Sequence, residues 1–273
     1  TDTKGNDTLY ISSNNQGIMQ FDNTGQSSNF HPWNGFNDMV PDGQGGMYAI
    51  RSNSLFYIDA GGSESLFATG LLTNSYGLAL DGIGNAYVAN KTDSSLQKVD
   101  SSGSVSVFSS DPLLNEPFDL AFDSNGILYA SNTNTDQILR FNSSGQATVF
   151  ASGLDIPLGM VFDDQDNLFV VNNGSASVAK IDPDGTVSGF ASTGSMTRPW
   201  DPALDNDGNL YVVSYWSTDI LKLTPSGTPS VFTTIPTNTQ AKFITIIPEP
   251  ASLGLLTIML FSCDSRRHMR STT

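Results

Sequence analysis

The sequence predicts an all-β protein, and three observations support this fold class. The 273 residues are rich in Asp, Asn, Ser, Thr and Gly, which favour turns and strand ends, and they contain few of the Glu and Lys residues that helices favour. An aromatic residue inside a strand-like run recurs about every 40 residues. Turns that start with Asp or Asn and contain Gly recur at two places in most repeats.

Two columns of aromatic residues follow the same period and define six copies of the repeat. The third copy shows four strand-like runs, at 76–81, 85–90, 95–100 and 104–109. A period near 40 residues with four strands per unit is typical of a β-propeller, so six copies predict six blades. The first column is Tyr10, Tyr48, Tyr87, Tyr129, Phe169 and Tyr211, and the second is Phe30, Phe67, Phe108, Phe150, Phe190 and Phe232.

The two ends of the repeat region indicate how the ring closes. The first copy lacks its innermost strand, whereas residues 240–247 form a spare strand-like run after the sixth copy. We expect this run to pair with residues 8–12, which removes two open sheet edges. The alternative is a linker to the C-terminal tail. The predicted organisation is an all-β six-bladed β-propeller of four-stranded blades (1–247), closed by a C-terminal strand and followed by a tail (248–273) with a short hydrophobic helix.

The repeats resemble those of the NHL family and of the gluconolactonase-like (senescence marker protein-like) six-bladed propellers. The resemblance rests on the runs 117–123, 126–132 and 137–142. Lactonases of this kind hold a divalent cation, usually calcium, in the channel with a Glu, an Asn and an Asp. Here the first channel column has Asn37 and then four apolar residues, so this metal set does not carry over. The resemblance therefore implies the architecture more than an activity.

The tail differs in composition from the repeats. Pro248, Glu249 and Pro250 precede an apolar stretch at 251–263, and Arg266, Arg267 and Arg270 follow it. This order resembles a PEP-CTERM sorting signal, which implies export across a bacterial inner membrane, transient anchoring there through 251–263, and cleavage by an exosortase-type enzyme. The apolar run is shorter than the roughly 20 residues that span a bilayer. A short tail that packs on the propeller is the alternative.

Composition excludes several classes of partner and chemistry. A net charge of -15 argues against nucleic acid, because phosphate binding needs clustered Lys and Arg. The single Cys precludes an intrachain disulfide, and with only two His a His-based catalytic or metal site is not expected. We expect a monomer without a resident cofactor, with Ca²⁺ as the alternative.

The channel mouth offers one candidate metal site. Asp38, Asp119 and Asp201 occupy equivalent positions in alternate repeats and are expected around the channel at threefold spacing. They could bind a cation as a carboxylate ring. Alternatively, each caps backbone amides at the start of its strand.

Aromatic and polar residues are expected to gather on the same face. Aromatic rings next to Asn and Ser suit a sugar ring, which stacks on one side and forms hydrogen bonds at its edge. The alternative is that the aromatic residues fill the core between blades. The candidate ligand residues are Asn37, Tyr76, Phe118, Trp200 and Trp216, and the accompanying asparagines are Asn90, Asn132 and Asn172.

These observations favour an exported, non-catalytic propeller at the cell envelope or in the extracellular matrix, which binds a glycan, a peptide or a matrix partner. The lactonase metal ligands and a catalytic His are not found, so the sequence leaves enzymatic activity uncertain and leans against it. The alternative function is a divalent-metal-dependent lactonase-type hydrolase that uses another ligand set.

Overall fold

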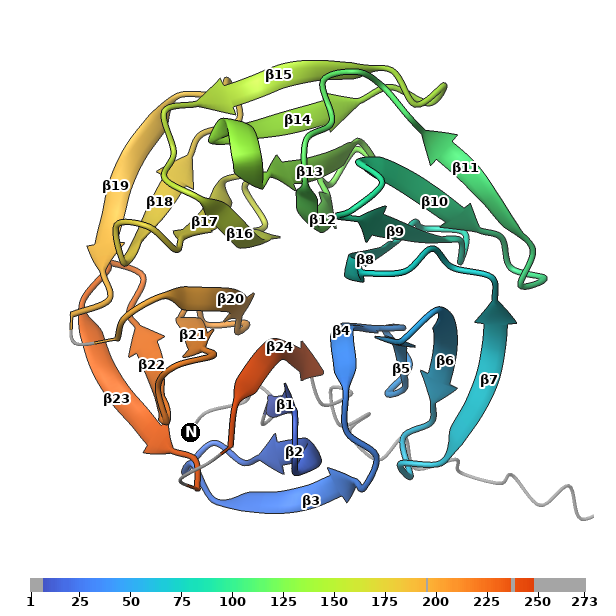
Figure 1. Ribbon diagram of the computed structural model, residues 1–273. Helices are drawn as coiled ribbons and strands as arrows, with labels where there is room; N and C mark the ends of the chain where they lie inside the picture. The colour runs from blue at the N-terminus through green and yellow to red at the C-terminus, as the bar shows by residue number, and fades with distance from the viewer. Residues whose placement is uncertain (1–6, 195, 237–238, 248–273) are drawn as a thin grey trace, which may run out of the picture.

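The computed structural model describes residues 7–194, 196–236 and 239–247. Within these residues the chain forms six four-stranded antiparallel sheets arranged as blades around a central axis (Figure 1). The sequence prediction of a six-bladed, all-β propeller is confirmed. In blades 2 to 6 the first strand in sequence is innermost and the fourth is outermost.

The blades take their strands in chain order, except for blade 1. One 3₁₀ turn, η1 (Thr133–Thr135), joins β13 to β14. Blade 1 is β24 (Ala241–Ile247), β1 (Thr8–Ser13), β2 (Gly17–Phe21) and β3 (Ser27–His31); blade 2 is β4 (Phe36–Pro41), β5 (Met47–Arg51), β6 (Ser54–Ile58) and β7 (Glu64–Thr69); blade 3 is β8 (Ser75–Leu80), β9 (Ala86–Asn90), β10 (Ser95–Val99) and β11 (Val105–Ser109); blade 4 is β12 (Pro117–Phe122), β13 (Leu128–Asn132), β14 (Gln137–Phe141) and β15 (Ala147–Ser152); blade 5 is β16 (Pro157–Phe162), β17 (Leu168–Asn172), β18 (Ser177–Ile181) and β19 (Val187–Ser192); blade 6 is β20 (Pro199–Leu204), β21 (Leu210–Ser214), β22 (Asp219–Leu223) and β23 (Pro229–Thr234).

The last described strand closes the ring. β24 pairs with β1 in an antiparallel ladder in which Ile244 lies opposite Ile11 and Ile246 opposite Leu9 (Figure 1). The closure predicted for residues 240–247 is confirmed, and the linker alternative is wrong. The strand joins here because its buried apolar side chains complete the core between blades 6 and 1.

The ring has two faces, which we name by their connections. Turns between the first and second and between the third and fourth strands of a blade lie on the turn face. Connections between the second and third strands, and from one blade to the next, lie on the loop face. Antiparallel strands of similar length produce this separation. The inner strands of blades 2 to 6 therefore start at the loop face and end at the turn face.

The two aromatic columns form the packing between blades. Tyr87 in β9 contacts Phe108 of its own blade at 4.9 Å between ring centroids and Phe122 of the next blade at 5.2 Å, both edge to face. Tyr129 repeats this arrangement one blade further with Phe150 and Phe162. Edge-to-face pairs contribute about 0.5–1.5 kcal/mol beyond area burial. The period seen in the sequence is therefore the period of the contacts between blades.

Glycines in the outer turns permit a close approach between neighbouring blades. Gly145 has φ +78°, and a Cβ atom there would overlap the carbonyl oxygen of Phe108 in the preceding blade. Gly126 has a similar φ of +75°, but a Cβ atom there would meet nothing within 4 Å. Both positions need a positive φ, but only Gly145 lies against the backbone of a neighbouring blade.

Gly145→Ala should therefore destabilise the protein more than Gly126→Ala. The second change carries only the cost of a left-handed residue with a side chain, about 1–2 kcal/mol. Gly145→Ala also forces blades 3 and 4 to shift at their contact. We therefore expect its free energy of unfolding to fall by about 1–3 kcal/mol more. Urea denaturation followed by tryptophan fluorescence measures both. Equal losses in the two variants would contradict this account of the contact.

The predicted tail lies outside the described residues. This applies to the short hydrophobic helix, to the proposed membrane segment 251–263 and to the sorting-signal residues Pro248, Glu249, Pro250, Arg266, Arg267 and Arg270. In the part of the chain that the structure describes, no helix is long and apolar enough to cross a membrane.

Candidate functional site

Every inner strand begins with a β-bulge, and these bulges build the centre of the molecule. In β4, Phe36 lies opposite Arg51 and Asp38 opposite Ile50, so that Asn37 is the extra residue. Bulges turn side chains away from the regular alternation of a strand. The extra residues of the six inner strands form one ring of positions at the loop-face end of the channel: Asn37, Tyr76, Phe118, Leu158, Trp200 and Lys242.

Sequence reasoning missed Lys242 as the sixth member of this ring. The other five were found by counting back from the Asp or turn residue that ends each inner strand. β24 ends at Ile247 without such a turn. Its bulge, with Ser12 opposite Phe243 and Ser13 opposite Ala241, supplies the register instead. Aligning the closing strand with the other inner strands by its apolar residues could have found it.

Three members of this ring pack with Phe243 into an aromatic plug across the channel. Phe118 from blade 4 stacks on Tyr76 from blade 3 with 5.1 Å between centroids, meets Trp200 from blade 6 edge to face at 5.2 Å, and stacks on Phe243 from blade 1 at 6.1 Å. Phe118 is 1% exposed and Phe243 is fully buried. Phe118 therefore lies in the core of the molecule, where it supports Tyr76 and Trp200 from below.

The three aspartates lie next to the plug and join neighbouring inner strands. Asp38 accepts hydrogen bonds from its own neighbour, the amide of Met39, and from the amide of Leu78 in blade 3, each at 2.6 Å. Asp119 does the same with Leu120 and with Met160 in blade 5, each at 2.7 Å. Each carboxylate thus satisfies two backbone amides, one local and one in the next blade.

Asp201 differs because Pro202 follows it. Proline has no backbone N–H, so the local bond cannot form. Asp201 keeps the bond across to the next blade, from the amide of Ile244 at 2.9 Å, and this bond joins blade 6 to the closing strand. Its other oxygen accepts no hydrogen bond from the described residues, although the residue is only 5% exposed.

A cavity of about 350 Å³ lies on the turn-face side of the plug and contains this carboxylate ring. It runs from Asp38, Asp119 and Asp201 to the last residues of the inner strands, such as Leu80 and Ile246. The threefold placement expected from the sequence is therefore present. The carboxylates line the channel from the turn-face side of the plug, whereas the sequence suggested that they share a mouth with the aromatic residues.

Burial dominates the electrostatics of the ring. Loss of hydration raises the pKa of Asp119 to about 7 in spite of its two amide partners. The pKa values of Asp38 and Asp201 are also raised well above the ordinary range, first by burial and then by repulsion from Asp119 and, for Asp38, from Asp201 as well. The three groups therefore do not all carry full charge near neutral pH.

The donor set of this ring does not match calcium well. Calcium takes six to eight oxygen ligands at about 2.3–2.6 Å, while five of the six carboxylate oxygens already accept backbone hydrogen bonds, from Met39, Leu78, Leu120, Met160 and Ile244. Within residues 7–194, 196–236 and 239–247, no group of three or more His, Cys, Asp or Glu side chains is placed to hold a metal ion. Metal binding at Asp38, Asp119 and Asp201 stays a prediction.

Most of the polar residues expected at the loop face serve the fold instead. Asn90 is fully buried and accepts a hydrogen bond from the Ser75 hydroxyl at 2.6 Å. Asn132 and Asn172 accept bonds from the amides of Asn115 and Asp155 in the loops that enter their blades. The expectation that these three asparagines form the edge of a ligand site is wrong, because each is buried and hydrogen-bonded inside the protein, Asn90 to β8 and the other two to an adjacent loop.

Exposed aromatic surface remains beside the ring of bulge residues, on blade 6. Tyr215 lies 5.7 Å from Trp200 and 5.0 Å from Trp216 between centroids, and Trp216 is 61% exposed. Arg198 lies over the Trp216 ring at 5.9 Å. From blade 1, the amide of Asn14 donates to the Tyr215 hydroxyl at 3.2 Å. We call Trp200, Tyr215 and Trp216 the aromatic cluster.

The remaining ring members connect this cluster to the opposite side of the mouth. The Asn37 amide donates to the carbonyl oxygen of Ser75 at 2.9 Å, and Asn37 Oδ1 lies 3.5 Å from Lys242 Nζ. Burial raises the pKa of the Tyr76 hydroxyl, and the nearby phenol of Tyr215 adds to the effect. The structure therefore brings Asn37, Tyr76 and Trp200 to one mouth with Trp216 beside it, and it buries Phe118 below them.

The one histidine in the described residues, His31, is a structural group at the outer edge of the ring. It is 2% exposed, and its ring nitrogens lie 3.0 Å from Gly62 O and 3.1 Å from Glu64 Oε2. Arg51 forms a two-pronged salt bridge with Glu64 at 2.7 Å for each bond and covers the ring of Phe56. These groups join blade 1 to blade 2 and are remote from the channel.

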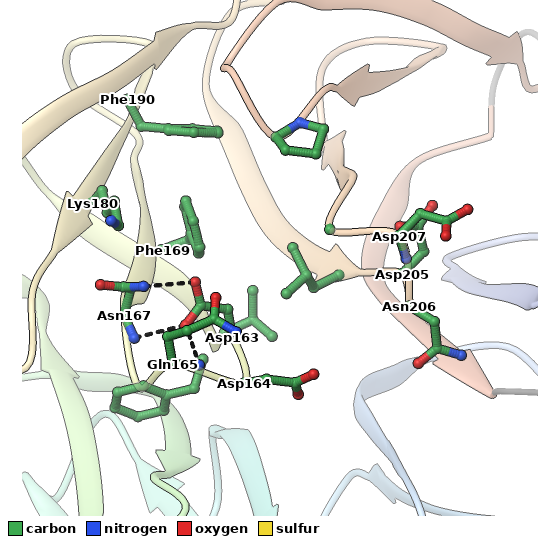
Figure 2. Close-up of a pocket in the computed structure, with 15 residues that line it drawn as sticks. Asp163, Asp164, Gln165, Asn167, Phe169, Lys180, Phe190, Asp205, Asn206 and Asp207 are labelled. Carbon is green, nitrogen blue, oxygen red and sulfur yellow. Dashed lines mark hydrogen bonds between the residues drawn. The ribbon is translucent and has the colours of Figure 1, made fainter.

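Sequence reasoning also missed a groove of about 580 Å³ between blades 5 and 6 (Figure 2). Phe169 and Leu204 are among the apolar residues that line it, and Asp163, Asp164 and Asp207 are among its acidic ones. Asp163 forms the side of the groove and accepts hydrogen bonds from Asn167, as Figure 2 shows.

Comparison with known proteins identifies the class and leaves the activity open. No family model and no curated protein sequence matches the chain. Solved six-bladed structures do match: a chain of a nidogen–laminin complex (18% identity, 88% of this chain and 98% of that chain, TM-score 0.77), a streptogramin B lyase (13%, 90% and 93%, 0.68) and virginiamycin B lyase from Staphylococcus aureus (15%, 84% and 84%, 0.63). The chain is a six-bladed β-propeller whose structural neighbours include a chain of a nidogen–laminin complex and two lyases. At these identities the likeness shows the fold alone.

The raised pKa of Asp119 predicts a pH-dependent stability. A carboxyl group whose folded-state pKa lies above its unfolded value contributes stability at low pH that is lost as pH rises through the folded-state pKa, here about 7. Asp119→Asn cannot ionise. Relative to the wild type, the variant should therefore gain about 2–3 kcal/mol between pH 5 and 8, since about two pH units of this interval lie below the folded-state pKa.

Urea denaturation at several pH values measures this difference. Asp166→Asn is the control, because hydrogen bonds from Ser124 hold the pKa of Asp166 below its ordinary value and outside this range. Its stability relative to wild type should not change between pH 5 and 8. If the difference in stability between Asp119→Asn and the wild type also stays constant from pH 5 to 8, Asp119 is already ionised in the folded protein.

Proposed function

We propose that this protein is an exported, non-catalytic binding module that takes a saccharide of the cell envelope or extracellular matrix at the loop-face mouth of its channel. The observation that carries the proposal is the contrast between the two sides of the plug. On the loop face, the aromatic cluster is exposed or half-buried beside amide side chains. On the turn face, the carboxylates are largely engaged by backbone amides.

Saccharide binding accounts for this combination of groups. Exposed aromatic rings are normally removed from water when a protein has a partner, and sugar rings stack on them through their C–H faces. The amides of Asn14 and Gln240, which contact each other at 2.7 Å, supply donors and acceptors next to Tyr215. A rigid propeller presents such a site without rearrangement, so little conformational entropy is lost on binding.

Trp216→Ala should weaken saccharide binding about five- to tenfold, because it removes one stacking ring. Titration calorimetry with the full chain and a panel of oligosaccharides measures the affinity. Ile83→Ala is the control, since Ile83 is also exposed (80%) but lies in the turn between β8 and β9, on the opposite face. Failure of every saccharide to bind, or an equal loss in both variants, contradicts the proposed site.

We further propose that the tail directs the protein to the cell envelope and is processed by an exosortase-type enzyme. The support is the order of Pro248, Glu249 and Pro250, an apolar stretch and three arginines. Cleavage near the tripeptide would leave the last ring-closing strand, which ends at Ile247, with the propeller.

Changing the three tail arginines to Ser in the full chain should abolish membrane retention and processing. The replacement removes the positive charge that holds a C-terminus on the cytoplasmic side. Fractionation and mass measurement in a bacterial host that carries the processing enzyme follow both events. Unchanged location and mass would show that the tail is not a sorting signal. The replaced residues are Arg266, Arg267 and Arg270.

A metal-dependent hydrolase is the second candidate. The free oxygen of Asp201 and the cavity beside it favour this function over catalysis elsewhere in the described residues. It requires bound calcium in the purified full chain and lactone hydrolysis that is lost in Asp119→Ala. That result would replace the non-catalytic proposal.

A further inference from the structure

Lys242 is a cation without an anion in a strongly acidic protein. The side chain is half-buried at the ring of bulge residues, and its ammonium group makes one polar contact, at 3.5 Å to the amide oxygen of Asn37. No carboxylate of the described residues lies within salt-bridge distance. By contrast, the half-buried Lys222 and Arg51 are each paired with a carboxylate.

A partly buried charge without a counter-charge is costly to the fold. Burial favours the neutral amine, and it lowers the pKa of Lys242 accordingly. The strand around Lys242 does not require a cation, because the equivalent positions of the other inner strands hold amide, aromatic or aliphatic side chains. The ammonium group therefore destabilises the fold of the unliganded protein, and the ring of bulge residues does not need it.

A second hydrogen-bond donor, on the adjacent inner strand, also lacks a partner. The indole N–H of Trp200 is buried and has no hydrogen-bond acceptor among the described residues. Leaving a buried donor unpaired costs about 1–3 kcal/mol. Trp200 and Lys242 occupy equivalent bulge positions on β20 and β24, which pack side by side between blades 6 and 1. The mouth thus has two donors that the protein itself leaves without acceptors.

The surroundings of these donors select the kind of acceptor. Arg198, over Trp216, likewise has no carboxylate partner among the described residues. Lys242 and Arg198 are therefore two cations without salt bridges to the described part of the chain, next to an aromatic cluster, in a protein whose net charge is -15. A neutral sugar would stack on the cluster and leave the ammonium group unmatched. A carboxylate would match the ammonium group.

We propose that the loop-face mouth between blades 6 and 1 recognises an acidic sugar, a uronate residue of a polysaccharide, with Lys242 binding its carboxylate and the aromatic cluster holding its ring. The inference rests on the saccharide-binding function proposed above and narrows it to one ligand class. Lys242 is the residue that separates uronates from neutral sugars, and Trp216 and Tyr215 supply affinity for both.

The test compares trigalacturonate with its methyl ester, which keeps the sugar rings and removes the charge. We expect the full-length wild-type protein to bind trigalacturonate about tenfold or more tightly than the ester in titration calorimetry at low salt, with the difference shrinking as salt is raised. Lys242→Gln should abolish this preference by lowering the affinity for trigalacturonate to about that for the ester. Lys242→Arg should keep much of it.

Lys180→Gln is the matched control, because it removes the same charge from a lysine that is paired with Asp182 far from the mouth. It should preserve the preference for trigalacturonate. A second measurement does not use ligand. Lys242→Met should raise the thermal midpoint of the full chain, since it removes an unpaired, half-buried charge. A lowered midpoint would show that the fold itself needs the ammonium group.

The outcomes separate this inference from the function on which it rests. Equal binding of trigalacturonate and its ester, or a preference that survives Lys242→Gln, overturns the uronate assignment and leaves a neutral-sugar module. Absence of any saccharide binding overturns both. Binding of trialanine through its free carboxylate, lost in Lys242→Gln and without saccharide binding, would assign the mouth to peptide C-termini and also overturn the uronate proposal.

Discussion

The pairing of β24 with β1 is the constraint on which the rest of the molecule depends. Five blades are built from consecutive strands, but blade 1 takes its inner strand from the other end of the repeat region. This pairing fixes the number of blades and the diameter of the ring. It also carries Phe243 into the plug and Lys242 to the mouth, so the closing strand supplies part of the centre of the channel and a half-buried cation with no salt bridge among the described residues.

The inner strands are held together in two different ways around the axis. The aspartates join blades 2 to 3, 4 to 5 and 6 to 1 through amides of the following blade. Two of the three seams between them have a glycine at this position: a Cβ at Gly77 would come within 2.5 Å of Asp119 Cα, and one at Gly159 would overlap the Asp201 carboxylate. In the third seam, between blades 1 and 2, Phe243 takes this position. Asp and Gly alternate from blade 2 to blade 6 because the inner strands lie close together around the axis. This close packing explains why the acids occur in every second blade.

The sequence predicted the architecture well because the repeat columns are themselves the contacts. Tyr87, Phe108 and their equivalents recur since each blade packs on the next in the same way, and the closing strand was recognisable from its apolar residues and from the strand missing at the start. The site was predicted in part. Positions that enter the inner strands could be counted from the repeat, but their burial could not be predicted. Whether an aromatic side chain such as Phe118 is covered depends on the β-bulges and on residues from the far side of the propeller.

Asparagines were the least predictable group. Asn90, Asn132 and Asn172 match ligand residues by type and position, but a polar side chain at a strand end is equally suited to bind a neighbouring strand or the backbone of a loop. Only the path of that loop distinguishes the two roles. Lys242 was missed for a related reason: it belongs in space to the first repeat and in sequence to the end of the sixth.

The order of the strands along the chain also determines when the fold can be completed. A chain made from its N-terminus can assemble blades 2 to 6 one after another from neighbouring segments, but β1 waits with an open edge until the partner of Ile11, Ile244, has been synthesised. The ring is therefore completed by its last strand, and the mouth, to which that strand contributes Lys242, is assembled in the same step. A partly made or truncated chain has neither a sealed sheet nor a finished binding surface.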